Sequence, residues 1–437
     1  MRPISAFARF SSSRCDKKVV PETATRKDVK QYEKSFHWSR QCAHVGWSRY
    51  LRERRPRRRR ESDLSNHEEV TMHDVYTLYG AQISNYTAKV RSYLIFKGIP
   101  FQEMVASNAV YDRFLVPRIG YRMMPVLRMP EGNMLQDSTD IVDEMEARFP
   151  LVSVYPSTPV LHLANLLVEA YAHDWVRIPA MYYRWAFPET NYEYLKAEFG
   201  RMYEPMAQPS QQLIVGEKSC AWARDRLPSL GISPETAPEV QRWTENLLGW
   251  LDAHFGDHDY LFGSRPSTAD FAFMGPLYAH FYRDLYSSAL LQRHFPNVVR
   301  WVERMNSPAK RPGEYFGEDE VPETLMPLLR HLFAEYVPVA CDTIDRVADW
   351  IDANYSSPIP RLLGTQDFTI GKVSGERNVW TCIQYMFQRP LFYYQRAPES
   401  AKREMNVLLA RIGKDIKLDK VVRHPVRHHN HRLVVDR

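Results

Sequence analysis

The segment Ser84-Asn85-Tyr86-Thr87 places hydroxyl and amide side chains where a helical pattern begins, just after an apolar run. A thiol is mostly protonated at pH 7, because its ordinary pKa is about 8.5. A hydroxyl that donates to the sulfur favours the thiolate by about 1.5–3 kcal/mol, and a helix N-terminus adds about 0.3–1 kcal/mol. Ser84 is therefore the candidate for activating a thiol, with Asn85 as the second donor. The structural alternative is that Ser84 or Thr87 only caps the helix.

Two further segments have side chains and backbone suited to binding a peptide. Met124-Pro125-Val126 contains an X-Pro bond. Its cis form would turn the chain and leave the Val126 amide and carbonyl free to pair with an extended peptide, whereas the alternative is a proline that only starts a strand. Asp137 and Ser138 stand where a second helix begins. Ser138 and the backbone amides can hold a carboxylate there, while Asp137 accepts from an ammonium group.

These residues need a scaffold, and the apolar pattern between 75 and 150 predicts one. Short β-branched and aromatic runs indicate strands, whereas apolar residues three and four apart indicate helices with one buried face. The order of these elements, β-α-β and then β-β-α, is that of a thioredoxin-like α/β domain. We expect a strand over 75–79, a helix over 86–97, a strand over 101–105, a hairpin of 125–128 with 134–135, and a helix that ends at Pro150.

Beyond this half, the chain from 161 to 306 lacks strand patterns and has long amphipathic helix patterns. Proline and glycine breaks then precede two helices, expected over 325–337 and 341–353, and a mixed segment to about 413. The last stretch is interpreted as a solvated basic tail rather than a metal site. Its histidines are His424, His428, His429 and His431.

Charge is distributed unevenly along the chain. The formal net charge is +6, but residues 1–71 hold 18 Lys and Arg against 9 Asp and Glu, so the remainder is slightly acidic. The arginine run between 54 and 60 could bind nucleic acid or an import receptor, and a disordered tail is the preferred interpretation. Residues 1–15 have the Arg- and Ser-rich composition of a mitochondrial transit peptide. A start of translation at Met72 would explain the leader equally well.

The sequence argues against several other classes of function. No apolar run reaches the roughly 18 residues that a membrane-spanning helix requires. The five cysteines are scattered without CxxC spacing, which argues against a disulfide framework or a zinc site and favours a reducing compartment. Glycine-rich phosphate loops and the HExxH and GxSxG motifs do not occur between 72 and 413. We therefore expect no metal, no nucleic-acid partner and no integral membrane segment.

Four motifs, in this order, resemble those of the glutathione transferase family. The segment from Ser84 to Arg91 is similar to the serine or cysteine signature that opens the family's first helix. Met124-Pro125-Val126-Leu127 resembles the cis-proline turn before the third strand, and the segment from Asp137 to Ile141 resembles the acidic-serine motif. In the helical half, the segment from Arg265 to Asp270 resembles the buried N-capping box. The resemblance covers about 235 residues, from 72 to 306.

The resemblance implies an enzyme that binds glutathione, ionises its thiol with Ser84, and conjugates, reduces or isomerises an apolar electrophile. Tyr79 and Tyr86 are alternative donors, because some classes of the family use a tyrosine. Arg118 or Arg122 would bind the glycine carboxylate. The implied glutathione-binding residues are Asn85, Met124, Pro125, Val126, Asp137 and Ser138. Asp137 departs from the usual Glu or Gln, which shortens the reach toward the ammonium group.

The resemblance also implies a second-substrate pocket and an oligomer. The helix that borders this pocket in the family carries here an aromatic stripe of Tyr171, Trp175, Tyr182 and Trp185, although such a stripe is more often core. A cytoplasmic homodimer is expected, with a mitochondrial location as the alternative. A non-catalytic scaffold is the alternative function, since this fold is also used for interactions. The expected parts are a basic leader (1–71), a thioredoxin-like domain (72–155), an all-helical domain (156–306) and a mostly helical extension (307–437).

Overall fold

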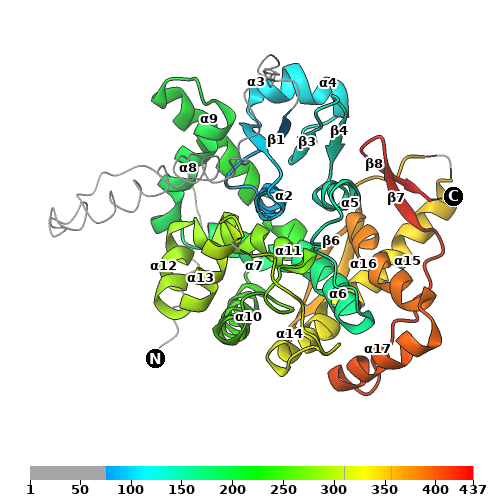
Figure 1. Cartoon of the computed structure of the whole chain (residues 1–437). Coiled ribbons are helices and arrows are strands. Elements are labelled where there is room, and N and C mark those ends of the chain that lie inside the picture. The colour runs from blue at the N-terminus through cyan, green and yellow to red at the C-terminus, as the bar shows by residue number, and fades with distance from the viewer. Residues whose placement is uncertain (1–74, 310, 356, 437) are drawn as a thin grey trace, which may run out of the picture. The chain divides into compact units, whose positions relative to one another are not determined.

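The computed structural model describes residues 75–309, 311–355 and 357–436 (Figure 1). The chain divides into two units, residues 1–71 and residues 72–437, and all the described residues belong to the second. The predictions about the leader, its targeting and a start at Met72 therefore lie outside the described residues. Within those residues, no helix is both long enough and apolar enough to span a lipid bilayer.

The first part of the described chain is a four-stranded mixed sheet with helices, which confirms the thioredoxin-like prediction. The strand order is β2-β1-β3-β4. β1 pairs with β2 in parallel, and β3 pairs with β1 and with β4 in antiparallel orientation. The elements are β1 (Tyr76–Gly80), α2 (Asn85–Lys97), β2 (Phe101–Val105), α3 (Asn108–Val110), η1 (Tyr111–Leu115), α4 (Val116–Ile119), β3 (Val126–Arg128), β4 (Met134–Gln136) and α5 (Ser138–Arg148).

The helical stretch from α3 to α4 was not predicted from the sequence. Its buried residues Tyr111, Leu115 and Ile119 recur at every fourth position, as one face of a helix requires. They pack against Tyr79 and Val126 of the sheet. The adjacent strand residues of β1 and β3 belong to a different core cluster, because side chains of a strand alternate between its two faces.

The second part is helical, as predicted, and α11 lies at its centre in contact with both α2 and α6. A capping box starts α11, in which the Asp270 carboxylate accepts from the amides of Ser267 (2.9 Å) and Leu261 (3.0 Å) and from Trp301 Nε1 (3.2 Å). This bears out the capping interpretation. The elements are α6 (Pro159–Asp174), α7 (Arg177–Trp185), α8 (Pro188–Tyr203), α9 (Pro209–Arg224), η2 (Leu227–Leu230), α10 (Ala237–Asp257), α11 (Thr268–Pro276), η3 (Leu277–Tyr282), α12 (Leu285–His294) and α13 (Pro296–Met305).

The extension after residue 306 does not pack as a separate body. Its helices α16 and α17 contact α6, and one core cluster contains residues from Leu78 to Leu418. The boundary expected at 306 therefore divides the chain in sequence only, because the hydrophobic core continues across it. The elements are η4 (Glu323–Leu325), α14 (Met326–His331), η5 (Leu332–Tyr336), α15 (Val337–Ala353), β5 (Leu362–Ile370), β6 (Val373–Trp380), α16 (Cys382–Arg396), α17 (Glu399–Ile412), β7 (Val426–His429) and β8 (Arg432–Val435).

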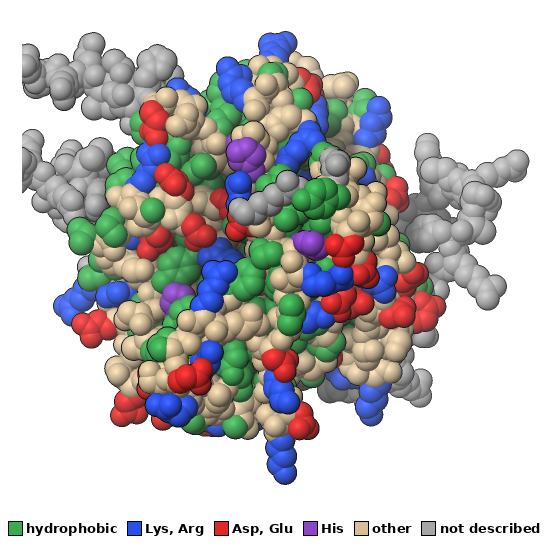
Figure 2. Space-filling model, turned by 90° about the vertical axis from the view of Figure 1, so that its right-hand side faces the viewer, with side chains coloured by type: hydrophobic (Ala, Val, Ile, Leu, Met, Phe, Trp, Pro, Cys, Tyr) green, Lys and Arg blue, Asp and Glu red, His purple; other side chains and the backbone are tan. Residues whose placement is uncertain are grey.

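The prediction of a solvated tail at the C-terminus is wrong, because the histidine-rich stretch forms the β7–β8 hairpin. Val426 and Leu433 of this hairpin are buried in a cluster with residues of α15. Just before β7, Arg423 pairs with Asp349 and with Asp352 of α15. Acidic and basic side chains lie in close groups on this face of the molecule (Figure 2). Apolar burial and charge pairing together hold the tail on the protein.

Candidate functional site

The three predicted segments meet at one edge of the sheet. Ser84 lies in the loop after the carboxyl end of β1, Pro125 immediately precedes the amino end of β3, and Asp137 immediately follows the carboxyl end of β4. β3 is antiparallel to both of its neighbours, β1 and β4. The end of β1, the start of β3 and the end of β4 therefore lie side by side, and the topology brings the three segments together.

Ser84 is the half-buried N-cap of α2. Its Oγ accepts from the Thr87 amide at 3.4 Å, so the capping role is present, and the hydroxyl hydrogen stays available to donate. No acidic residue in the first turn of α2 offsets the positive end of the helix. Arg184 Nη1 donates to the Ile83 carbonyl at 3.2 Å and fixes the loop on α7. Beside it, the buried Asn85 Oδ1 has no hydrogen-bond partner among the described residues.

The two alternative donors are poorly suited to activating a thiol. Burial raises the pKa of Tyr86 to about 12. Its hydroxyl donates to the His173 carbonyl (3.3 Å) and accepts from Arg177 Nη1 (3.4 Å). Tyr79 is a buried core residue of β1, and burial raises its pKa as well. The Tyr86 hydroxyl hydrogen is engaged by the His173 carbonyl and Tyr79 is packed in the core, whereas the Ser84 hydroxyl hydrogen stays available to donate.

The peptide bond between Met124 and Pro125 is cis, as the resemblance to the family's cis-proline turn implies. Val126, however, lies opposite Tyr79 of β1 and opposite Gln136 of β4, so its amide and carbonyl face a neighbouring strand. This corrects the expectation that the backbone of Val126 is free. Within the described chain, no backbone hydrogen bond involves Met124, which packs beside the segment that leads to Ser84. The free backbone is therefore that of Met124.

Asp137 and Ser138 stand at the N-terminus of α5. Asp137 is the N-cap, with φ +88°, and its Oδ1 accepts from the Thr139 amide at 2.8 Å. Ser138 is 2% exposed, and its buried Oγ has no hydrogen-bond partner among the described residues. Buried hydroxyls almost always have a partner, so this hydroxyl has the environment of a group that is completed by a ligand.

A buried ionic network that sequence reasoning missed lies behind this edge. Lys89 Nζ, on α2, donates to Glu169 Oε1 of α6 (2.8 Å) and to Thr139 Oγ1 of α5 (2.9 Å). Thr268 Oγ1, on α11, donates to Glu169 Oε2 at 2.9 Å. The network joins the sheet domain to the helical domain. A carboxylate in the apolar run of α6 was the available signal, because a buried carboxylate requires a cationic partner.

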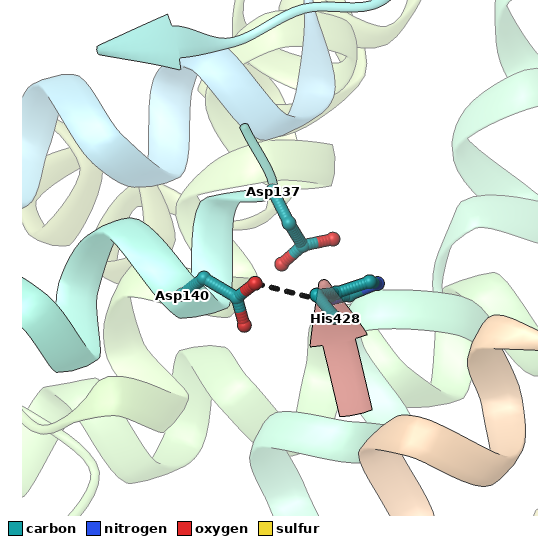
Figure 3. A group of neighbouring side chains, drawn as sticks. All are labelled: Asp137, Asp140 and His428. Atoms are coloured by element: carbon teal, nitrogen blue, oxygen red, sulfur yellow. Dashed lines mark ion pairs between the residues drawn. The ribbon is translucent and has the colours of Figure 1, made fainter. Parts of the chain in front are cut away.

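A side chain from the far end of the chain lies against the start of α5 (Figure 3). His428 of β7 forms an ion pair with Asp140, with 2.8 Å between Nδ1 and Oδ2, and the Tyr385 hydroxyl donates to the same carboxylate. Burial opposes ionisation of Asp137, but the charges of His428, His173 and Lys89 and the hydrogen bond from the Thr139 amide together outweigh burial, so the pKa of Asp137 is lowered. The sequence could not have shown this contact, because it joins residues almost 300 positions apart.

The same three side chains, Asp137, Asp140 and His428, are the one group of metal-ligand type found within the described residues. Their candidate ligand atoms all lie within 4.8 Å of one another. The Thr139 amide, the Tyr385 hydroxyl and the ion pair already engage these atoms, so hydrogen bonding accounts for their arrangement. The absence of a bound metal stays a prediction.

Comparison with known families agrees with this geometry. Residues 78–153 match the Glutathione S-transferase N-terminal domain, and residues 221–308 match the Glutathione S-transferase C-terminal domain. The chain therefore contains regions that match both domains of the glutathione S-transferase family. No curated protein sequence matches it.

Several solved structures, glutathione transferases and a β-etherase among them, are similar to about half of this chain. One from Rhodospirillum rubrum F11 has 15% identity and a TM-score of 0.33, over 57% of this chain and 97% of its own. A β-etherase from Sphingobium sp. strain SYK-6 has 19% identity and a TM-score of 0.37, over 55% and 96%. A glutathione S-transferase of Ceriporiopsis subvermispora, in complex with glutathione, has 18% identity and a TM-score of 0.36, over 54% and 100%.

The structure does not bring the four residues of the aromatic stripe together as a pocket lining. Tyr171 and Trp175 are fully buried and pack against Trp243 and against Tyr336 of the extension. Trp185 instead stacks on Phe199, in a separate cluster, and Tyr182 packs against Tyr183 and Phe187. The structure places the first two residues in the core.

The two candidate residues for the glycine carboxylate lie on and after α4, and both have neighbours. Arg122 donates to Asn108 and to Asp112, which leaves less of its charge for a ligand. Arg118 is exposed, donates to the Phe114 carbonyl and covers the Phe114 ring. This geometry does not favour either arginine as the residue that would bind the glycine carboxylate.

Proposed function

We propose that this protein binds glutathione and that Ser84 stabilises the glutathione thiolate for conjugation, reduction or isomerisation of an apolar electrophile. The observation that carries the proposal is the convergence of Ser84, the Met124 backbone and the Asp137–Ser138 pair at one edge of the sheet. Ser84 would meet the sulfur, the Met124 backbone would pair with the cysteinyl residue, and Ser138 with Asp137 would hold the γ-glutamyl end.

The test is the ionisation of bound glutathione. Ser84→Ala removes a donor that binds a thiolate more strongly than a thiol, so the pKa of bound glutathione should rise by about one to two units. Thiolate absorbance against pH, for the parent and the variant, measures this rise directly. Turnover of a model electrophile at neutral pH should fall in parallel.

Ser107→Ala provides a matched control. Ser107 caps α3 in the same domain, and its Oγ accepts from the Val110 amide at 3.3 Å. Both substitutions remove a helix cap, which costs about 0.5–2 kcal/mol of stability. Only the change at Ser84 should move the thiolate titration. Superimposable titrations for parent and Ser84→Ala would remove Ser84 from the mechanism and make Asn85 the next residue to test.

A non-catalytic binding role is the second candidate, and one observation favours it. The extension covers the start of α5 and places His428 beside Asp137, where a γ-glutamyl group would bind. Retention on immobilised glutathione together with turnover supports the enzyme. Failure to bind glutathione at any concentration supports the scaffold.

The homodimer and the cytoplasmic location are further proposals that rest on family resemblance. Light scattering of the purified full chain measures its mass in solution. A mass of one chain would refute the dimer, and import of the full chain into isolated mitochondria would refute the cytoplasmic location.

A further inference from the structure

The β7–β8 hairpin reaches the γ-glutamyl end of the proposed site from the C-terminal extension (Figure 1). His428 pairs with Asp140, and its ring lies 4.4 Å from the Tyr385 ring of α16. The Tyr121 hydroxyl, from the segment between α4 and β3, donates to the His431 carbonyl at the hairpin turn. The hairpin therefore contacts α5 and the segment between α4 and β3.

The chemistry of this contact resembles half of a γ-glutamyl group. His428 places its ring nitrogen Nδ1 2.8 Å from the Asp140 carboxylate and beside Asp137, and these two carboxylates together outweigh burial and raise the pKa of His428. A γ-glutamyl end would present an ammonium to the same carboxylates and a carboxylate to Ser138. No group of the hairpin supplies that carboxylate, and the buried Ser138 Oγ is left without a partner in the described chain.

The hairpin is held by a small set of contacts with α15 and α16. Its two strands have four residues each, and a hairpin of this size is marginal on its own. On its other side, Gln388 of α16 exchanges hydrogen bonds with the backbone of Val426. Asn430 and His431 form the turn with positive φ values of 46° and 61°. Docking on α16 and α15 therefore decides whether the hairpin stays in place.

We propose that the β7–β8 hairpin is a built-in competitor of glutathione, which occupies the γ-glutamyl subsite with His428 and must be displaced before the peptide binds. The inference rests on the proposed glutathione-binding function and adds its regulation. A site that is open in only a fraction of molecules binds its ligand more weakly by that same fraction. The hairpin thus sets the glutathione concentration at which the protein responds.

The experiment compares glutathione binding by the full chain and by two variants at His428, measured by calorimetry. His428→Ala removes the ion pair, and His428→Gln keeps a polar side chain without the charge. Loss of one charge-assisted contact should shift the equilibrium between the docked and the displaced hairpin roughly tenfold toward the displaced state. Both variants should therefore bind reduced glutathione about tenfold more tightly than the parent. His429→Ala is the matched control, because His429 is the next residue of the strand and is exposed. It should bind like the parent.

Proteolysis gives a second measurement that needs no substitution. Arg427 and Arg432 lie in the hairpin and are cleavage sites for trypsin. Saturating glutathione should accelerate cleavage at these sites in the parent, as followed by intact mass.

The outcomes separate this inference from the proposed function. If the parent binds glutathione and the His428 variants bind no more tightly, with unchanged cleavage, the competitor is refuted and the function stands. Weaker binding by the variants would make His428 a glutathione ligand and would also refute the competitor. If neither the parent nor the variants bind glutathione, the proposed function fails and the inference falls with it.

Discussion

Glu169 joins the helical domain to the sheet domain through one buried ion pair, and replacing it should destabilise the whole described unit. The carboxylate is 1% exposed and lies 2.8 Å from Lys89 Nζ. Burial opposes its ionisation, but the charges of Lys89 and Arg389 and the hydrogen bonds from Lys89 and Thr268 together outweigh burial and lower the pKa from the ordinary 4.5 to about 2. Glu169→Gln removes this charge and leaves Lys89 buried without its counter-ion.

The lowered pKa of Glu169 gives the size of the expected loss in the free energy of unfolding. One pKa unit corresponds to about 1.4 kcal/mol, so the ionised carboxylate contributes about 3 kcal/mol at neutral pH, similar to the 3–5 kcal/mol that breaking a buried pair usually costs. The folded pKa lies below the unfolded pKa. The contribution is therefore complete above about pH 5 and is lost as the pH falls from 4.5 toward 2.

Urea unfolding of the parent and of Glu169→Gln at several pH values measures the contribution of this carboxylate to stability. The free energy of unfolding should differ by about 3 kcal/mol at pH 7, and the difference should narrow between pH 5 and pH 3. The double variant Lys89→Met, Glu169→Leu should recover most of the loss, because it buries no charge. Glu144→Gln is the control, since Glu144 pairs with Arg148 at the surface and should cost less than about 1 kcal/mol. A loss below 1 kcal/mol for Glu169→Gln, or one that does not change with pH, would refute the reasoning.

Two further predictions concern packing in the helical domain. Asp270→Ala leaves the buried amides of Leu261 and Ser267 without an acceptor, at about 1–3 kcal/mol each, so its melting temperature should fall well below that of the parent; an unchanged melting temperature would show that water replaces the carboxylate. Gly216→Ala would place a Cβ 1.9 Å from the Lys196 carbonyl oxygen, which must push α9 away from α8. Calorimetric melting should show a clear loss for Gly216→Ala and none for Gly249→Ala, where no atom lies within 4 Å.

Local patterns were enough to predict the sheet domain and the segments that form its proposed site. β-branched runs, the glycine at the end of α2 and the turn between β3 and β4 are short-range signals, and the structure has strands and helices at those places. The capping box of α11 was also readable, because its Ser267 and Asp270 stand at a fixed spacing. The cis bond before Pro125 followed from motif resemblance rather than from the residues alone.

Contacts between distant parts of the chain could not be predicted in the same way. The partnership of Lys89 with Glu169 spans 80 positions, and that of Asp140 with His428 spans far more. The tail was misinterpreted because its charges, counted alone, indicate solvent exposure. The acids of α15 that neutralise those charges lie about 70 positions earlier. The composition of a segment does not determine whether it is exposed to solvent, because its exposure depends on the other parts of the chain that pack against it.

The shared core also has a consequence for how the protein is made. The family domains end near residue 306, but α6 is covered by α16, whose last residue is Arg396. At the usual synthesis rate of about 5–20 residues per second, the ribosome needs about 5 to 20 seconds to add those 90 residues. During that interval α11 can already pack against α6, but the side of α6 that contacts α16 and α17 is complete and still uncovered. A nascent chain of this protein therefore needs protection from aggregation until its final part emerges, and chaperones that hold exposed apolar helices should associate with it during that window.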